Sequence, residues 1–175
     1  MKQFLRGTYG IPTVLLVFSL LVLTMAVVVR QYQEKGRSEN FQVATSWVDG
    51  QDLEASATCA TGTSPEIQVK NVPQGTKHFA LYLRSENDGT DWLVSGIPSE
   101  IKLLPAGTKP EGTTYRNQKG NFSYVAPCKA GKYTLSIFAL GEDFPDLNSG
   151  TDPDLVLANL NRLKLAQHSI TVSVR

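Results

Sequence analysis

The stretch Ser64–Leu83, SPEIQVKNVPQGTKHFALYL, predicts two consecutive β-strands joined by a tight turn. In the first half, Ile67 and Val69 alternate with polar residues, and the second half alternates in the same way through Phe79 and Leu81. The segment Val-Pro-Gln-Gly between the halves carries turn chemistry. Period-two alternation is typical of half-buried strands, so this stretch favours a β-rich domain.

Two later segments, KYTLSIFALG at 132–141 and SITVSVR at 169–175, show the same alternation. A further strand is expected at DWLVSGI, 91–97, which is short and apolar. Asn-Asp-Gly and Pro-Ala-Gly sequences mark turns at 87–89 and 105–107. We therefore expect a mainly β domain that ends in a strand.

One helix is predicted before that final strand. Asp152 can cap its N-terminus, and Pro153 suits the first helical position. Val156, Leu160 and Leu163 then fall on one face, so the helix is expected to run from Pro153 to about Ala166.

The N-terminal region, residues 1–30, is expected to be a membrane anchor. Ile11–Val29 holds 19 residues without a charge. As a helix it would be about 28 Å long, close to the thickness of the bilayer core. A cleaved signal peptide is the alternative, although no A-x-A-like cleavage site follows. Lys2 and Arg6 favour an N-terminus in the cytoplasm. Residues 31–40 are expected to be a polar linker, and residues 41–175 an extracytoplasmic domain.

Composition and charge limit the classes of partner that this domain is expected to bind. Apolar residues make up 41% and charged residues 19% of the chain, with a formal net charge of +1. These values are ordinary for a globular protein. Basic residues form no stripe with interleaved aromatic residues, so we expect no nucleic-acid binding.

The chain has two cysteines, Cys59 and Cys128. Outside the cytoplasm they are available as a disulfide, and two buried free thiols are the alternative. Two isolated cysteines do not make a zinc site. The acidic residues between Asp143 and Asp154 lack the spacing of a calcium loop and fit a solvated loop with a helix cap. We therefore expect no metal and no cofactor.

With these segments placed, the chain resembles the phosphatidylethanolamine-binding protein family, in particular its bacterial Raf-kinase-inhibitor-like branch. That branch shows Ser-Pro-Pro, Val-Pro-x-Gly-Thr, His-Trp-Val-Val, Gly-Pro-Cys-Pro and His-Arg-Tyr in this order. The matching places here hold SPE at 64–66, VPQGT at 72–76, DWLV at 91–94, APCK at 126–129 and GKY at 131–133. The resemblance spans residues 41–175 in one collinear pass.

The resemblance implies an antiparallel β-sandwich with a few peripheral helices. Together with the segments predicted above, the expected fold is such a sandwich with a C-terminal helix, preceded by an N-terminal transmembrane helix. It also implies a Cys59–Cys128 disulfide, because both cysteines fall where the bacterial branch often has cysteine. The family's hallmark is a small pocket for phosphate-type head groups. The residues implied to form this pocket are Ser85, Asn87, Asp91, Trp92, Tyr124, Pro127, Gly131 and Tyr133.

Several of these positions depart from the family pattern. Asp91 and Gly131 stand where the family has pocket histidines, and Ser85-Glu86-Asn87 replaces its Asp-Pro-Asp. An imidazole can donate a hydrogen bond to phosphate, whereas a carboxylate accepts only and repels an anion. We therefore expect a degenerate pocket that has lost its phosphate chemistry.

Other residues are candidates for a functional role. His78 is interpreted as a surface or edge histidine without a partner, and His168 as a structural residue near the C-terminal end of the helix. A triad of Ser85, Asp91 and His78 lacks the Gly-x-Ser-x-Gly elbow of a hydrolase. The long segment 109–127 shows no clear strand; its aromatic residues are expected to anchor the loop or to line a pocket rim. These aromatic residues are Tyr115, Phe122 and Tyr124.

We thus expect a non-enzymatic, membrane-anchored domain that binds a small molecule or a lipid head group. A protein-interaction module that inhibits a protease or a kinase-like partner is the alternative, and a hydrolase is a third hypothesis.

Overall fold

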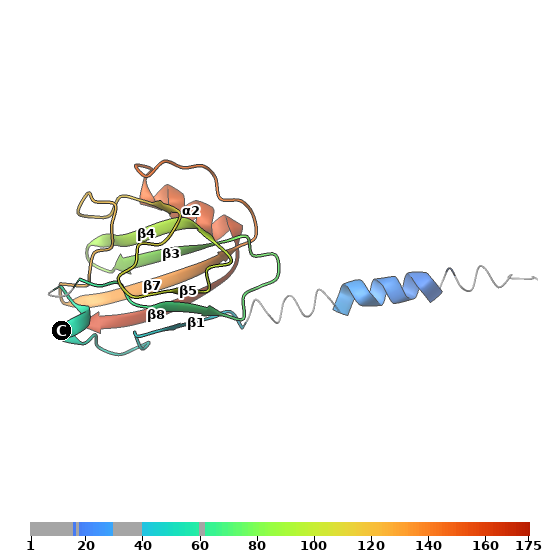
Figure 1. The fold of residues 1–175 in the computed structure, drawn as a ribbon, viewed down its shortest axis with the longest axis horizontal. Coiled ribbons are helices and arrows are strands. Elements are labelled where there is room, and N and C mark those ends of the chain that lie inside the picture. Colours follow the sequence, from blue (N-terminus) through green and yellow to red (C-terminus); the bar gives the residue numbers. More distant parts are fainter. Residues whose placement is uncertain (1–15, 17, 30–39, 60–61) are drawn as a thin grey trace, which may run out of the picture. The chain divides into compact units, whose positions relative to one another are not determined.

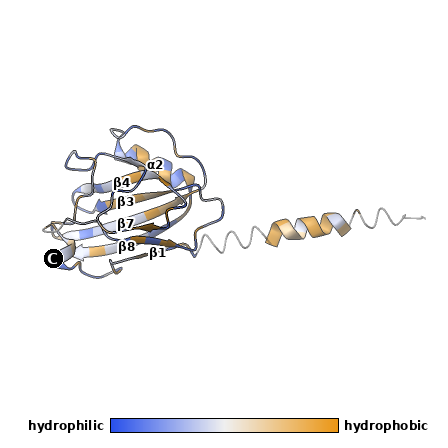
Figure 2. Cartoon of the chain, in the orientation of Figure 1, coloured by the Kyte–Doolittle hydropathy of each residue, from blue (hydrophilic) through white to orange (hydrophobic). Residues whose placement is uncertain are grey.

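The computed structural model describes residues 16, 18–29, 40–59 and 62–175 (Figure 1). The chain divides into two compact units, Met1–Gly36 and Arg37–Arg175. In the first unit, residues 18–29 form a helix that is predominantly apolar (Figure 2). No helix among the described residues is both long and apolar enough to cross a membrane. Much of the predicted anchor and nearly all of the predicted linker lie outside the described residues.

The second unit contains two antiparallel β-sheets. The small sheet has the order β1-β2-β5, from Gln42–Thr45, Ile67–Lys70 and Leu103–Leu104. The large sheet has the order β6-β4-β3-β7-β8, from Thr113–Thr114, Gly89–Pro98, His78–Ser85, Gly131–Leu140 and Lys164–Val174. A short 3-10 helix, η1 (Ala55–Ala57), and the helix α2 (Pro153–Leu163) complete the described elements of this unit. The predicted mainly β, antiparallel fold with a late helix is confirmed.

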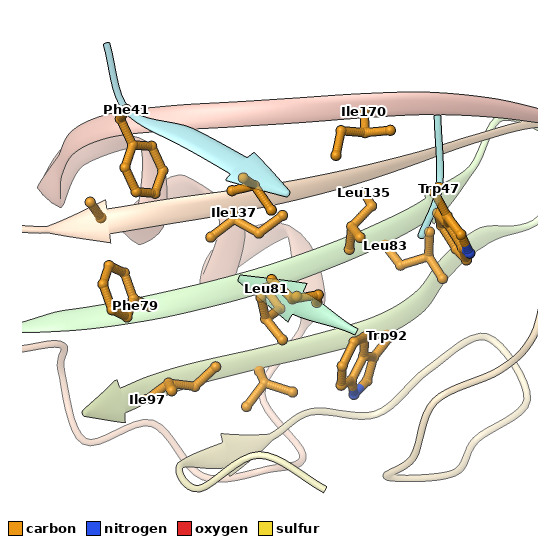
Figure 3. Close-up of a cluster of buried hydrophobic side chains, with 14 of the residues drawn as sticks. Phe41, Trp47, Phe79, Leu81, Leu83, Trp92, Ile97, Leu135, Ile137 and Ile170 are labelled. Atoms are coloured by element: carbon orange, nitrogen blue, oxygen red, sulfur yellow. The ribbon is translucent and has the colours of Figure 1, made fainter. Parts of the chain in front are cut away.

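The main core lies between the two sheets. Phe79, Leu81 and Leu83 of β3 belong to it, together with Phe41 beside β1 and Ile67 of β2 (Figure 3). Fully burying an aliphatic or aromatic side chain is worth roughly 1.5–3 kcal/mol. This shared core explains why the alternation in Ser64–Leu83 predicts the fold.

The opposite face of the large sheet is also buried. Ala80 and Tyr82 of β3 pack in a second cluster with Val156 and Leu160 of α2. The expectation of half-buried strands is therefore wrong for β3 and β7, most of whose residues are buried. Most residues of β4 are buried as well. The reason is that α2 and the segment carrying Tyr115 cover the second face.

The start of α2 matches its prediction and its end does not. Asp152 Oδ1 accepts a hydrogen bond from the Asp154 backbone N–H at 2.8 Å, and Pro153 occupies the first turn. The helix ends at Leu163 instead of Ala166, because β8 begins at Lys164 and Ala166 pairs with Ala139 of β7. Buried backbone groups must find partners, and β7 supplies them.

Two histidine interpretations also change. His168 lies within β8 opposite Ile137, and not near the end of the helix. His78 has a partner, since its Nε2 lies 3.4 Å from Asp143 Oδ1.

The segment 109–127 runs along the free edge of β4. It contains the short strand β6, which the sequence did not predict. Backbone N–H groups of Tyr115, Gln118 and Val125 donate to carbonyl groups of β4 at 2.9, 2.8 and 3.1 Å. This pairing places Phe122 and Tyr124 beside the start of β4, where the predicted pocket residues lie.

Candidate functional site

The predicted pocket residues gather at one end of the large sheet. Ser85 ends β3 and pairs with Gly89 at the start of β4 and with Tyr133 near the start of β7. The turn after β3 and the loop before β7 therefore lie side by side. The Glu86 backbone N–H donates to the Lys132 carbonyl at 3.0 Å across this junction.

The polar groups of the β3–β4 turn are already engaged. The Ser85 hydroxyl accepts hydrogen bonds from the backbone N–H groups of Asn87 and Asp88, both at 3.2 Å. The Asn87 side chain donates to the Ala130 carbonyl at 3.4 Å. The exposed Lys129 ammonium lies 2.9 Å from Asp88 Oδ1. Ser85 and Asn87 thus stabilise the turn.

Tyr133 holds the cysteine loop in place. Its buried hydroxyl accepts hydrogen bonds from the backbone N–H groups of Cys128 and Lys129, at 3.3 and 3.1 Å. It donates to the Lys129 carbonyl at 3.0 Å. One hydroxyl has one hydrogen and two lone pairs, so Tyr133 has no capacity left for a ligand.

The predicted Cys59–Cys128 disulfide is present. The two Cα atoms are 4.8 Å apart, within the range of ordinary disulfides. The bridge joins the segment that follows η1 to the loop that precedes β7. It closes a sequence separation of 69 residues. Pro127, next to the bridge, is buried.

Gly131, at the second histidine position of the family, leaves no room for a side chain. Its φ is +144°, in the region that favours glycine. A Cβ atom built there would lie 2.7 Å from the Asn87 Nδ2 atom. A histidine would have to displace the Asn87 amide and change the backbone.

Asp91 is the extra residue of a β-bulge. Leu83 pairs with Trp92, and Arg84 pairs with Thr90, so that Asp91 is skipped. Asp91 is only 1% exposed. Its Oδ1 accepts a hydrogen bond from the Gln118 side-chain amide, and its Oδ2 has no hydrogen-bond partner among the described residues.

The environment of Asp91 perturbs its titration. Burial raises the pKa of the Asp91 carboxyl to about 6. The hydrogen bond from Gln118 and the charge of Lys119 oppose this rise, and the charge of Asp88 adds to it. At neutral pH the site therefore holds a buried carboxylate, which disfavours an anion nearby.

Trp92 and Tyr124 form an aromatic wall. Their ring centroids are 5.4 Å apart, with an interplanar angle of 82°. This edge-to-face arrangement is favourable for aromatic pairs. Burial, and then the charge of Asp91, raise the pKa of the Tyr124 phenol well above its usual value. The charge of Asp91 therefore reaches this wall.

A cavity of about 230 Å³ adjoins the wall, and we name it the Trp92 cavity. Its lining comes from the segment after Cys59, from β4, from the loop after β5 and from the segment 109–127. The lining residues are Gly62, Ser64, Trp92, Gly107, Thr108, Lys109, Pro110, Thr114, Phe122, Ser123 and Tyr124.

The eight predicted pocket residues thus divide into two groups. Trp92 and Tyr124 line the Trp92 cavity. The other six lie around the neighbouring turns and line none of the cavities described here. Thr114 and Gln118 were missed, because only the folded segment 109–127 brings them to β4.

Two residues that line this cavity, Thr114 and Tyr124, carry a buried polar atom without a hydrogen-bond partner. Among the described residues, four buried side-chain polar atoms lack a hydrogen-bond partner. Three of them belong to Asp91, Thr114 and Tyr124, and the fourth to His78 at the other end of β3. Buried polar groups are normally hydrogen-bonded, so such atoms call for a ligand or ordered water.

A larger cavity lies nearby but lacks these features. It has a volume of about 620 Å³ and lies between the β3–β4 turn, residues 116–118 and the N-terminus of α2. None of its lining residues is a predicted pocket residue or carries one of the four unpartnered atoms.

The fold agrees with comparisons to known proteins. The profile of the family described as phosphatidylethanolamine-binding protein matches residues 43–175. The UPF0098 protein YbcL of Escherichia coli (strain K12) is 32% identical over 127 residues, which cover 62% of this chain and 69% of the relative. A UPF0098 protein of Aquifex aeolicus (strain VF5) is 30% identical over 140 residues, covering 71% and 82%. This chain belongs to the phosphatidylethanolamine-binding protein family.

Solved structures support the same assignment. The crystal structure of E. coli YbcL, described as a new member of the mammalian PEBP family, has a TM-score of 0.68 at 28% identity. The match covers 77% of this chain and 98% of YbcL. A phosphatidylethanolamine-binding protein homologue from Chlamydia trachomatis has a TM-score of 0.69, covering 77% and 97%. At 19% identity this second structure supports the fold alone.

Proposed function

We propose that this domain binds a small ligand or a lipid head group in the Trp92 cavity, without the phosphate chemistry implied by the family resemblance. The observation that carries the proposal is the aromatic-walled cavity itself, which is lined by Trp92 and Tyr124 together with polar side chains such as Thr114. Ligand pockets typically combine apolar walls with a few placed polar groups.

The loss of phosphate chemistry is supported at the substituted positions. The Ser85 hydroxyl and the Asn87 amide are hydrogen-bonded within the turn. Gly131 offers no side chain, and Asp91 supplies a buried negative charge. None of these positions carries a cationic side chain that could hold an anion.

A binding role is favoured over a catalytic role. Ser85 and His78 stand at opposite ends of the eight-residue strand β3, about 23 Å apart at 3.3 Å per residue. They cannot act together on one substrate. The Ser85 hydroxyl also accepts two backbone hydrogen bonds.

We further propose that the domain is anchored in a membrane and lies outside the cytoplasm. The charge-free run Ile11–Val29 supports the anchor, and the disulfide supports an oxidising compartment. Mass spectrometry of membrane-extracted protein tests the anchor. An intact N-terminus is expected, and an N-terminus near Arg30 would show a cleaved signal peptide instead.

A thermal-shift screen of the full chain in dodecyl maltoside tests the ligand proposal. The probes are inorganic phosphate, phosphorylated head groups, small amines and neutral alcohols. A ligand that binds only the folded state raises the Tm. We expect shifts from amines or alcohols and none from phosphate. A screen without any shift would contradict the proposal and favour a protein partner.

A further inference from the structure

A further cavity lies beside α2, on the face of the large sheet that turns away from the small sheet. It has a volume of about 300 Å³ and is lined by residues of β3, β7, β8 and α2. We name it the Arg84 cavity. Its lining residues are Tyr82, Arg84, Thr134, Ser136, Phe138, Leu157, Asn161 and Gln167, none of which lines the Trp92 cavity.

The register of the strands brings the polar residues of the Arg84 cavity together. Arg84 of β3 stands opposite Thr134 of β7, and Tyr82 stands opposite Ser136. Directly opposite residues of antiparallel strands share one face of the sheet, with Cβ atoms about 4.5–5.5 Å apart. From β8, Gln167 Nε2 donates to Ser136 Oγ at 3.5 Å. Three neighbouring strands therefore contribute polar side chains to one place.

The hydroxyl groups at this cavity keep hydrogen-bond donors. Thr134 Oγ1 lies 3.1 Å from Thr171 Oγ1, and Ser136 Oγ lies 2.8 Å from Ser169 Oγ. Each pair holds two hydroxyl hydrogens and uses one of them between its members. These hydroxyl groups have no further acceptor among the described residues, so one O–H donor of each pair is left over.

Lys164 occupies the acceptor oxygens of the two amides in the lining. Its ammonium lies 2.9 Å from Asn161 Oδ1 and 2.9 Å from Gln167 Oε1. The Asn161 Nδ2 group has no partner in the described part of the chain, so its two N–H donors remain. The ammonium also lies 6.0 Å from the centroid of the Phe138 ring, which places a positive charge beside the cavity.

Arg84 is the one charged residue in the lining of this cavity. Its side chain is exposed and makes no ion pair or hydrogen bond with the described residues. A guanidinium carries five N–H donors in a planar fork that fits both oxygens of a carboxylate. The polar part of the lining is thus a set of donors around a positive charge. Tyr82, Phe138 and Leu157 supply apolar walls beside it.

We propose that the Arg84 cavity binds a small organic carboxylate with an apolar body. The carboxylate accepts hydrogen bonds from the Arg84 fork and from the donors left over, and the body lies against the apolar walls. A single guanidinium matches the single charge of a carboxylate better than the nearly double charge of a phosphate group. The site is separate from the Trp92 cavity, so its failure leaves the function proposed above standing.

Three probes of similar shape and different charge test this proposal: phenylacetate, phenylacetamide and phenethylammonium. Inorganic phosphate is the fourth probe. The full chain in dodecyl maltoside is titrated at pH 7.5 and low ionic strength, and the backbone ¹H–¹⁵N signals of Thr134 and Gln167 are followed. The indole signals of Trp47 and Trp92 are internal references, because these residues line two other cavities.

The charge of the probe decides the expected result. We expect phenylacetate to saturate the Thr134 and Gln167 signals at roughly tenfold lower concentration than phenylacetamide, a difference of about 1.4 kcal/mol. Phenethylammonium and inorganic phosphate should not saturate them.

The variant Arg84→Gln removes the charge from the cavity. We expect its preference for phenylacetate over phenylacetamide to fall to about one. Arg84→Lys keeps the charge and loses the fork, so an intermediate preference is expected. Arg162→Gln is the matched control, because Arg162 is an exposed arginine of α2 that does not line the cavity. All variants are first compared with the parent by their spectra, so that a misfolded protein is recognised.

Each other outcome overturns a defined part of the proposal. Equal affinities for phenylacetate and phenylacetamide overturn the carboxylate as ligand, and so does saturation of the same signals by inorganic phosphate. A shift of Trp92 with unmoved Thr134 and Gln167 signals overturns the location. Signals that stay unmoved with every probe overturn the site itself. An unchanged preference in Arg84→Gln overturns the role of Arg84.

Discussion

The side-chain amide of Asn87 lies where a side chain at Gly131 would begin. A Cβ atom at Gly131 would lie 2.7 Å from Asn87 Nδ2. The Asn87 amide also donates a hydrogen bond to the carbonyl of Ala130, the residue before Gly131. Both residues stand where the resemblance implies family pocket residues. We therefore propose that the two positions are structurally coupled, since the Asn87 amide fills the space that a side chain at Gly131 would need.

This coupling predicts the effect of Gly131→Ala. We expect the variant to lose about 1–3 kcal/mol of unfolding free energy, from the backbone conformation and from the contact with Asn87. In the double variant Asn87→Ala/Gly131→Ala only the backbone part of the loss should remain. Urea unfolding of the four proteins of this cycle measures the difference. Strictly additive losses would mean that Asn87 and Gly131 are independent.

The buried carboxylate of Asp91 predicts an unusual dependence of stability on pH. Its folded-state pKa of about 6 lies above the unfolded value of 3.8, so the folded protein holds this proton more tightly. The contribution of Asp91 to stability is therefore greatest below pH 4 and is lost as the pH rises through 6. The unfolding free energy of Asp91→Asn should equal that of the parent near pH 4. At pH 8 it should be larger than that of the parent by at most about 3 kcal/mol.

Chemical unfolding of both proteins between pH 4 and pH 8 measures this difference. Asp143→Asn is the control, because the hydrogen bond and charge of Lys77 lower the pKa of Asp143. Compared with the parent, Asp143→Asn should be less stable at pH 8 than it is at pH 4, which is the opposite trend to that of Asp91→Asn. Parallel curves for Asp91→Asn and the parent would show that Asp91 is not perturbed.

Much of the fold follows from sequence patterns, because long strands carry their own signal. The segments around Leu81 and Ile137 alternate over their whole length and form β3 and β7. The strands β1, β5 and β6 have two to four residues and give no periodic pattern. The start of α2 could be predicted from its N-cap residue, Asp152. Its end could not, because it depends on the pairing of Ala166 with Ala139 of β7.

The site was less predictable than the fold, for a physical reason. Collinear motifs placed Trp92 and Tyr133 at one end of the domain. Whether each side chain lines a cavity or holds a loop depends on long-range hydrogen bonds. Tyr133 turned out to be an anchor for the Cys128 loop, and Gln118 reaches Asp91 across 27 residues of sequence.

The disulfide predicts a large loss of stability on removal. Closing a loop of about 70 residues is worth about 4 kcal/mol in the chain-entropy account. The variant Cys59→Ala/Cys128→Ala should lower the Tm by about 10–15 °C. Calorimetry compares it with the parent in the presence and absence of a reductant. A reductant should lower the Tm of the parent and leave the variant unchanged; equal Tm values without reductant would contradict the prediction.

Two tyrosines near the site predict opposite responses to the same substitution. The Tyr115 hydroxyl lies 2.8 Å from Ser95 Oγ, whereas the buried Tyr124 hydroxyl has no partner among the described residues. Tyr115→Phe should destabilise the ligand-free domain by about 1–3 kcal/mol, because buried Ser95 loses its partner. Tyr124→Phe should be neutral or stabilising. A loss of more than 1 kcal/mol in Tyr124→Phe would show that its hydroxyl is satisfied by water.

The central claim is that this chain keeps the family fold and has lost the phosphate chemistry. Titration calorimetry of inorganic phosphate into the full-length parent and into Asp91→His tests it most directly. We predict no saturable heat up to about 10 mM in either protein, because Gly131 has no side chain, and Ser85 and Asn87 carry no positive charge and are tied to the turn. Saturable binding with a micromolar Kd, in the parent or in the single variant, would contradict the account.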